Sequence, residues 1–133
     1  MKDRFFLYFD TMPKGTAQQV RHNSRTGSYF KDKKLASTEA QFLAALKPHA
    51  PKTPSDKPIR LTVRFYFNVR QKNLWGKLKT TRPDTENYLK LFKDCMTKLG
   101  YWRDDAQVCD EHTYKYYAEK ACIVVDWEEI EDE

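Results

Sequence analysis

The strictest constraint on the fold is an alternating segment in the middle of the chain, Ile59 to Val69. Every second residue is apolar, in the order Ile, Leu, Val, Phe, Phe, Val, and the residues between them are polar. Because side chains alternate between the two faces of a β-strand, this segment predicts a long strand with one face in a core. The chain of 133 residues fits one compact domain built on such a core.

Three further elements can be predicted from apolar spacing. Arg4 to Asp10 is apolar on both faces, which predicts a first strand that is central or covered on both sides. Lys31 to Leu46 has the spacing of an amphipathic helix. Gln107 to Ala118 and Ala121 to Trp127 predict two strands, and the short turn between them favours a hairpin.

A second helix is predicted from Thr85 to Leu99. Pro83 and Asp84 form a start signal, an apolar stripe repeats every three or four residues, and Gly100 ends the helix. The order of elements is therefore β-α-β-α-β-β. It predicts an α/β (α+β) fold in which a small mixed β-sheet of about four strands carries two helices on one face.

The charge is unevenly distributed along the chain. Residues 1–127, the expected single domain, hold 24 basic and 14 acidic side chains, whereas residues 128–133 form an acidic C-terminal tail with five acids. A body with a net charge of +10 favours a polyanionic partner, and nucleic acid is the first candidate. A basic surface that serves only solubility is the plainer alternative.

Two segments without acids are predicted to be DNA-binding loops, Thr11 to Phe30 and Arg70 to Arg82. Trp75, inside the second loop, is either a base-stacking side chain or a packing anchor. Basic side chains in such loops suit contacts with the phosphate backbone. The candidate DNA-binding residues are Lys14, Arg21, Arg25, Arg70, Lys72, Lys77, Lys79 and Arg82.

Acidic residues gather at the two ends of the second predicted helix. Asp84 and Glu86 stand at its start, and Asp104 and Asp105 stand between its end and the next strand. Hydrolysis of a phosphodiester needs an activated water and a stabilised leaving oxygen, and a magnesium ion held by carboxylates provides both. We therefore expect one magnesium site, with Lys90 on the same side of the helix to hold the scissile phosphate.

Each of these residues also has an ordinary structural explanation. Asp84 could cap the helix, Lys90 could form a salt bridge with Glu86 four residues earlier, and Asp104-Asp105 could be a plain turn. The three cysteines and three histidines are dispersed, so the spacing of a zinc site is absent. No apolar run approaches a membrane span or a signal peptide, and we expect a cytoplasmic protein without a membrane partner.

The combined motif resembles the RusA family of Holliday junction resolvases. It is carried by Pro83-Asp84-x-Glu86-Asn87-x-x-Lys90-x-x-x-Asp94 and by Gly100-Tyr101-Trp102-x-Asp104-Asp105-Ala106-Gln107-Val108, with Lys115 where the family often has a strand lysine. The best match covers Arg82 to Lys115, and the order of the other elements agrees.

The resemblance implies a magnesium-dependent endonuclease in which Mn²⁺ could replace Mg²⁺. The implied substrate is branched DNA with four-way junctions, resolved by paired symmetric nicks of a homodimer in recombination and repair. The resemblance makes Asp84, Glu86 and Asp105 the metal-binding carboxylates, with Asp104 beside them, and Lys90 the catalytic lysine. Asn87, Asp94, Gln107 and Lys115 take supporting positions. Proteins of this kind are bacterial or carried by prophages.

Glu86 departs from the pattern, because the family has an Asp at this position. The longer side chain keeps the charge but moves the carboxylate. Two alternatives follow: a module that binds branched DNA with weakened or lost catalysis, and a nuclease for flaps and other branched DNA.

Overall fold

A computed structural model describes residues 1–15, 20–23, 28–31 and 33–131, without the side chains of 20–23 and 28–31. Its elements follow the predicted order, with one additional pair of short strands. The strands are β1 (Lys2–Phe9), β2 (Val20–Asn23), β3 (Ser28–Lys31), β4 (Ile59–Asn68), β5 (Val108–Ala118) and β6 (Ala121–Glu129). The helices are α1 (Lys33–Leu46) and α2 (Thr85–Lys98), with 3-10 turns at Lys47–His49, Lys72–Leu74 and Asp105–Gln107.

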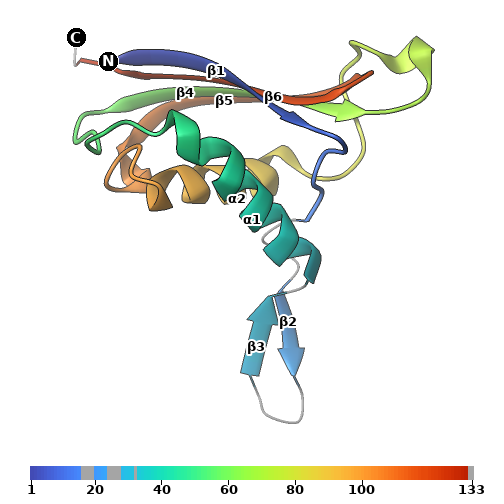
Figure 1. The fold of residues 1–133 in the computed structure, drawn as a ribbon, viewed down its shortest axis with the longest axis horizontal. Helices are drawn as coiled ribbons and strands as arrows, with labels where there is room; N and C mark the ends of the chain where they lie inside the picture. Colours follow the sequence, from blue (N-terminus) through green and yellow to red (C-terminus); the bar gives the residue numbers. More distant parts are fainter. Residues whose placement is uncertain (16–19, 24–27, 32, 132–133) are drawn as a thin grey trace.

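The main sheet has four strands in the order β1-β6-β4-β5. β5 runs parallel to β4, and the other neighbours are antiparallel, so the sheet is mixed. Figure 1 shows α1 and α2 on one face of this sheet. The predicted fold class is confirmed. In the described part of the chain, neither helix is long and apolar enough to cross a membrane.

The predicted hairpin of β5 and β6 is wrong, because β4 lies between the two strands. Glu119 and Lys120 instead carry the chain across the end of β4, where the amide of Val69 donates to the carbonyl of Ala118 at 2.9 Å. The strand with the strictest apolar alternation therefore takes a central position, paired on both sides. A short connection predicts proximity of two strands, but it does not require direct pairing.

Two further expectations in the first thirty residues are corrected. β1 is an edge strand whose Phe6 and Tyr8 are exposed, so its second apolar face is not covered within one chain. The segment expected as a loop from Thr11 to Phe30 contains the β2–β3 hairpin, which projects away from the sheet in Figure 1. Its polar composition gave no apolar alternation from which these strands could be predicted.

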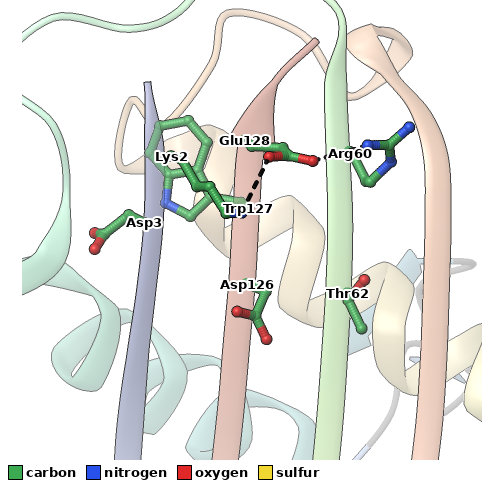
Figure 2. Close-up of a pocket in the computed structure, with 7 residues that line it drawn as sticks. All are labelled: Lys2, Asp3, Arg60, Thr62, Asp126, Trp127 and Glu128. Carbon is green, nitrogen blue, oxygen red and sulfur yellow. Dashed lines mark hydrogen bonds and ion pairs between the residues drawn. The ribbon is translucent and has the colours of Figure 1, made fainter.

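The sheet face opposite the helices is here called the open face. Its charged end is shown in Figure 2, where Lys2, Glu128 and Arg60 lie side by side on β1, β6 and β4. Arg60 lies 2.8 Å from Glu128 and 2.7 Å from Asp110 of β5. The open face consists of Lys2, Arg4, Phe6, Tyr8, Arg60, Thr62, Arg64, Tyr66, Asp110, His112, Tyr114, Tyr116, Cys122, Val124, Asp126 and Glu128.

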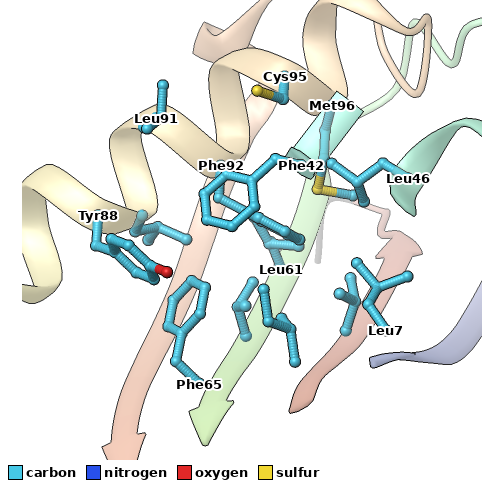
Figure 3. Close-up of a cluster of buried hydrophobic side chains, with 14 of the residues drawn as sticks. Leu7, Phe42, Leu46, Leu61, Phe65, Tyr88, Leu91, Phe92, Cys95 and Met96 are labelled. Carbon is cyan, nitrogen blue, oxygen red and sulfur yellow. The ribbon is translucent and has the colours of Figure 1, made fainter. Parts of the chain in front are cut away.

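The core lies between the other sheet face and the helices (Figure 3). Phe42 of α1, Phe92 and Tyr88 of α2 and Phe65 of β4 meet edge to face, with ring centroids 4.7–5.6 Å apart. The Tyr88 hydroxyl donates to the carbonyl of Pro13, which ties α2 to the chain that follows β1. This packing fixes the buried side of α2, and therefore also the side that α2 presents to solvent.

The first two acids of the expected tail belong to the sheet, since β6 ends at Glu129. Glu129 accepts from the N-terminal amine of Met1 at 2.8 Å and from the hydroxyl of Ser55 at 2.5 Å. Glu128 pairs with Arg60. These contacts join both ends of the chain to one edge of the domain.

Candidate active site

A groove of about 280 Å³ runs between α2 and β5, on the solvent side of the helix. Glu86, Lys90 and Lys93 follow one another at helical spacing, so that one face of α2 lines the groove. Asp105 and Glu111 line it from the loop before β5 and from β5 itself. Carboxylates and ammonium groups therefore share one concave surface, which suits a polyanion that is bound together with cations.

Asp84 does not line the groove and lies immediately before α2, two residues from Glu86, which does line it. It occupies the N-cap position, but its carboxylate makes no capping hydrogen bond. The ammonium of Lys115 on β5 donates to the carbonyls of Thr81 and Pro83, at 2.7 Å each. Lys115 thus fixes the backbone that presents Asp84, which gives the strand lysine a positioning role.

Asp105 lies at the other end of the groove, against the last turns of α2. Its carboxylate accepts a hydrogen bond from the Thr97 hydroxyl, and the indole of Trp102 donates to the same hydroxyl at 2.7 Å. The carboxyl groups of Asp94 and Asp105 also hydrogen-bond to each other. Asp105 is therefore held by side chains of α2.

The two carboxyl groups of this pair differ in acidity. Loss of hydration, the hydrogen bond with Asp105 and its negative charge raise the pKa of Asp94 to about 6. Burial also opposes ionisation of Asp105, but hydrogen bonds from Asp94 and Thr97 and the charge of Lys93 lower its pKa below the usual value. Below about pH 6 a proton therefore resides on Asp94, and Asp105 is the ionised partner.

The structure does not bring Asp84, Glu86 and Asp105 to one point. Asp84 and Thr97 are separated by 13 residues of helix, which is about 20 Å along the axis. Since Asp105 contacts Thr97, two aspartate side chains cannot span the remaining distance to a common ion, whose oxygen ligands lie at about 2.1 Å. Among the described residues, no three acidic, histidine or cysteine side chains are grouped closely enough to hold a metal.

Asp104 and Gln107 build the turn that carries Asp105. The Asp104 carboxylate accepts from the amide of Ala106 at 2.8 Å, and the Gln107 side-chain oxygen accepts from the amides of Arg103 and Asp104, at 2.9 Å each. The Gln107 amide nitrogen donates to the carbonyls of Ser55 and Lys57, at 2.9 and 3.0 Å. These bonds give both residues an observed structural function.

The lysines of the groove have different surroundings. Lys90 is exposed, and the described residues include no ion pair between it and Glu86. The half-buried Lys93 lies 2.9 Å from Glu111. Lys93 and Glu111 were not identified from the sequence, although strand alternation places Glu111 on the same side of β5 as Lys115 and could have indicated it.

The second basic loop, Arg70 to Arg82, is hydrogen-bonded to β5 beside the start of α2. The amide of Lys79 donates to the carbonyl of Lys115 at 2.9 Å. The Lys79 ammonium lies over the rings of Phe67 and Tyr117, 5.1 and 5.0 Å from their centroids, and burial lowers its pKa. The Trp75 indole donates to the carbonyl of Val69 at 2.9 Å, which favours the packing anchor.

The other candidate DNA-binding residues differ in how far the structure describes them. Five basic side chains are exposed and able to meet a phosphate backbone: Lys14, Arg70, Lys72, Lys77 and Arg82. Arg21 belongs to β2, and its side chain lies outside the described part, as does the whole of Arg25. Asn87 is half-buried on the first turn of α2.

The donors in the groove suit a hard cation, which prefers carboxylate oxygens. When Asp94 is protonated, its carboxyl group hydrogen-bonds to that of Asp105, and a cation bound there would take the place of this proton. Glu86 lines the end of the groove nearest the start of α2, here called its entrance, and Asp84 immediately precedes α2, next to the second basic loop. The chemistry of the residues fits the expected metal, whereas a single three-carboxylate point does not fit this geometry.

Comparison with known proteins agrees with the motif. The family model described as "Endodeoxyribonuclease RusA" matches residues 10–128. The crossover junction endodeoxyribonuclease rusA of Lactococcus phage r1t is 32% identical over 132 residues, which is 98% of this chain and 100% of the phage protein. The uncharacterized protein YqaN of Bacillus subtilis (strain 168) is 27% identical and covers 92% of each chain. The chain therefore belongs to the RusA family of endodeoxyribonucleases.

Proposed function

We propose that this protein is a magnesium-dependent endonuclease that resolves four-way DNA junctions by paired nicks. The observation that carries the proposal is the groove between α2 and β5, where Glu86, Lys90, Lys93, Asp105 and Glu111 share one surface. The full-length similarity to a phage crossover junction endodeoxyribonuclease supports the choice of substrate. A role in DNA recombination and repair in a bacterial cytoplasm follows from that substrate.

Asp105 and Asp94 would hold the ion at the inner end of the groove. When bound there, a magnesium ion supplies Lewis-acid stabilisation and an acidic bound water. Thr97 keeps the Asp105 carboxylate directed into the groove by donating its hydroxyl proton. Lys90, exposed and unpaired with Glu86 in the described structure, is available to contact the scissile phosphate and to stabilise its negative charge.

Asp84 and Glu86 keep a metal-binding role in the proposal, but at a different point. Because α2 separates Asp84 from Asp94 by about 15 Å, these acids would bind a cation at the entrance of the groove. Lys115 orients that entrance through its bonds to Thr81 and Pro83. Glu86 reaches further than an Asp, which suits a position on the exposed first turn.

The basic loops extend the binding surface from this entrance. Arg70, Lys72, Lys77 and Arg82 are exposed in a segment that is hydrogen-bonded to β5. They would neutralise phosphates of one arm of the junction, and the arm that contains Lys14 would neutralise phosphates of another. A homodimer would supply two such surfaces, as the near two-fold symmetry of a four-way junction requires.

The proposal is tested by cleavage of a synthetic four-way junction in Mg²⁺ and in Mn²⁺. Asp84→Asn and Asp105→Asn are each expected to lower the cleavage rate roughly 100-fold or more while junction binding in EDTA persists. Asp56→Asn, the same change at an exposed loop position, should leave both measurements unchanged. Full cleavage by the Asp105 variant would overturn the site assignment.

Two outcomes would select the alternatives. If the unchanged protein binds the junction but makes no nick with either ion, it is a binding module that has lost catalysis, and Glu86 is the first residue to revert to Asp. If it cleaves flaps faster than four-way junctions at equal concentration, it is a nuclease for other branched DNA.

A further inference from the structure

The groove between α2 and β5 contains an ion pair to which the function proposed above gives no role. The ammonium of Lys93 on α2 lies 2.9 Å from the carboxylate of Glu111 on β5. Both side chains line the groove, together with Lys90 and Asp105. The pair therefore borders the surface where the reacting phosphate is expected to bind.

Lys93 belongs to a row of polar side chains along the groove side of α2. Lys90 precedes it by three residues and Thr97 follows it by four, so all three project to the same side of the helix. The Thr97 hydroxyl contacts the carbonyl of Lys93 at 3.2 Å and also the carboxylate of Asp105. Along the helix axis, Lys93 is about 6 Å from Thr97 and Lys90 is about 10 Å from it. Lys93 is therefore the lysine nearer to Asp105 and to the inner end of the groove.

The positive charge of Lys93 acts on the Asp105 carboxyl. Burial opposes ionisation of this carboxyl, whereas hydrogen bonds from Asp94 and Thr97 and the charge of Lys93 lower its pKa. An ammonium that stabilises the ionised Asp105 is also within electrostatic reach of an anion bound beside that carboxylate. The position of Lys93 is thus suited to a phosphate at the inner end of the groove.

The ion pair leaves part of the Lys93 ammonium available. A lysine ammonium has three hydrogens to donate, and within the described residues Glu111 is the one hydrogen-bond partner of Lys93. The Lys93 side chain is 18% exposed and that of Glu111 is 41% exposed. Lys93 is therefore largely shielded from water although it lines the groove. An ammonium shielded in this way attracts an anion more strongly than one surrounded by bulk water.

Stability alone does not account for the pair of Lys93 and Glu111. The buried side of α2 already holds the helix on the sheet, because Tyr88, Phe92 and Met96 belong to the core. A partly exposed ion pair contributes little to stability, and two packed apolar side chains would join α2 to β5 at least as well. Charged groups at these two positions therefore point to a charged ligand in the groove.

We propose that Lys93 is a second lysine that contacts the scissile phosphate, and that Glu111 is the residue that positions it. The inference rests on the proposed nuclease function. Lys90 and Lys93 are about 4.5 Å apart along the axis of α2, so both can reach one phosphate, with Lys93 on the side of Asp105. Glu111 holds the Lys93 ammonium at β5 before the substrate binds. A donor fixed in advance stabilises the negative charge of the transition state without rearranging.

The first test replaces Lys93 by a side chain of similar length without charge. Lys93→Met should lower the cleavage rate of a four-way junction in Mg²⁺ roughly 10- to 100-fold. For junction binding in EDTA, the slope of log K against log salt concentration should become less negative by about 1, because one phosphate contact is lost. Lys47→Met removes a charge at an exposed lysine outside the groove and should change neither measurement.

The second test measures Mn²⁺ affinity by calorimetry in the absence of DNA. The ammonium of Lys93 attracts a phosphate but repels a divalent cation at Asp105, so the two affinities should change in opposite directions. Lys93→Met should bind Mn²⁺ roughly 3- to 10-fold more tightly, although it cleaves more slowly. Local unfolding around α2 would weaken the binding of both Mn²⁺ and DNA, and this combination would contradict the proposal.

The third test asks whether Glu111 acts through Lys93. Glu111→Gln should lower cleavage of the junction when Lys93 is present, because the ammonium is no longer held in place. In the Lys93→Met background, the same change should not lower cleavage further. Lys93→Arg keeps a positive charge that can pair with Glu111 and should retain more activity than Lys93→Met.

Full cleavage by Lys93→Met, or an unchanged salt slope for this variant, would overturn the phosphate contact. An equal loss from Glu111→Gln in both backgrounds would overturn its positioning role, because Glu111 would then act independently of Lys93. Failure of the proposed nuclease function gives a different result, since the unchanged protein would make no nick with either ion. The salt slope in EDTA requires no cleavage, so it decides whether Lys93 contacts a phosphate in that case as well.

Discussion

The carboxyl groups of Asp94 and Asp105 hydrogen-bond to each other across the space between α2 and the turn before β5. Two carboxyl groups make such a contact only when a proton or another cation lies between them. The Thr97 hydroxyl and the Trp102 indole hold the Asp105 side in place. A metal ion bound between these two carboxyl groups would therefore replace the proton that they share.

The first prediction concerns the pH dependence of stability. Folding raises the pKa of Asp94 from 3.8 to about 6, mainly through burial and then through the hydrogen bond with Asp105. The folded protein holds this proton more tightly, so its stabilising contribution is complete below about pH 4 and is lost as the pH rises through 6. Asp94→Asn keeps an N–H donor towards Asp105 at every pH.

We therefore expect the melting temperature of Asp94→Asn, measured in EDTA, to exceed that of the unchanged protein at pH 8 and to match it at pH 4. Allowing for solvent screening of this half-buried pair, the gain is about 1 kcal/mol, or roughly 3–5 °C. Asp56→Asn serves as the control. A difference that does not vary with pH would contradict the shared proton.

The second prediction separates catalysis from stability at Lys90. Lys90→Ala should lower junction cleavage roughly 100-fold, because it removes the positive charge proposed to contact the phosphate. Lys90 is exposed and forms no ion pair with Glu86 in the described structure, so the melting temperature should change by less than about 2 °C. Lys47→Ala, at another exposed lysine, is the control. An equal loss of stability and activity would favour a structural role.

The third prediction concerns Lys115, which supports Asp84 from β5. Lys115→Met removes the donor to the carbonyls of Thr81 and Pro83 and should lower the free energy of unfolding by about 1–2 kcal/mol. Cleavage should fall further than this loss of folded protein explains, because Asp84 is no longer held in position. Lys115→Arg can donate to both carbonyls and should restore most of the activity. Lack of rescue by Arg would contradict a positioning role.

The sequence predicted local structure better than long-range order. β4 and α2 each end within one residue of the predicted limits, because alternation, the start signal at Pro83-Asp84 and Gly100 are all local. The position of β4 between β5 and β6 was not predicted, since strand order depends on contacts distant in sequence. The prediction that the first strand is covered on both sides was wrong for a related reason, because the apolar face with Phe6 and Tyr8 is uncovered within one chain.

The site was predicted as a set of residues, but not as an arrangement. The motif identified Asp84, Glu86, Lys90 and Asp105, and three of these line one groove. We expected the three carboxylates to bind one metal ion because the length of α2 cannot be seen in the motif. In the structure α2 holds Asp84 and Asp105 at its opposite ends. Glu111 was missed because it belongs to no motif and takes its place in the groove through the register of β5.

The last prediction concerns Gly15, near the start of the basic segment Thr11 to Phe30 that follows β1. Gly15 donates its amide to the Thr38 hydroxyl at 2.8 Å, and Thr38 donates to the carbonyl of Lys34 at 2.9 Å. A Cβ at Gly15 would lie 2.7 Å from the backbone nitrogen of Leu35, and closer still to the Lys34 carbonyl. Neither atom can move without disturbing the first turn of α1.

Gly15→Ala should therefore lower the free energy of unfolding by about 1–3 kcal/mol through overpacking, as measured by urea unfolding. Gly76→Ala is the matched control: its φ of +85° disfavours alanine, but a Cβ there has no atom within 4 Å. We expect a loss of about 1 kcal/mol at Gly76, from backbone conformation alone. A Gly15 variant as stable as the unchanged protein would show that the chain after β1 is not packed against α1. The basic segment Thr11 to Phe30 would then not be anchored at its start.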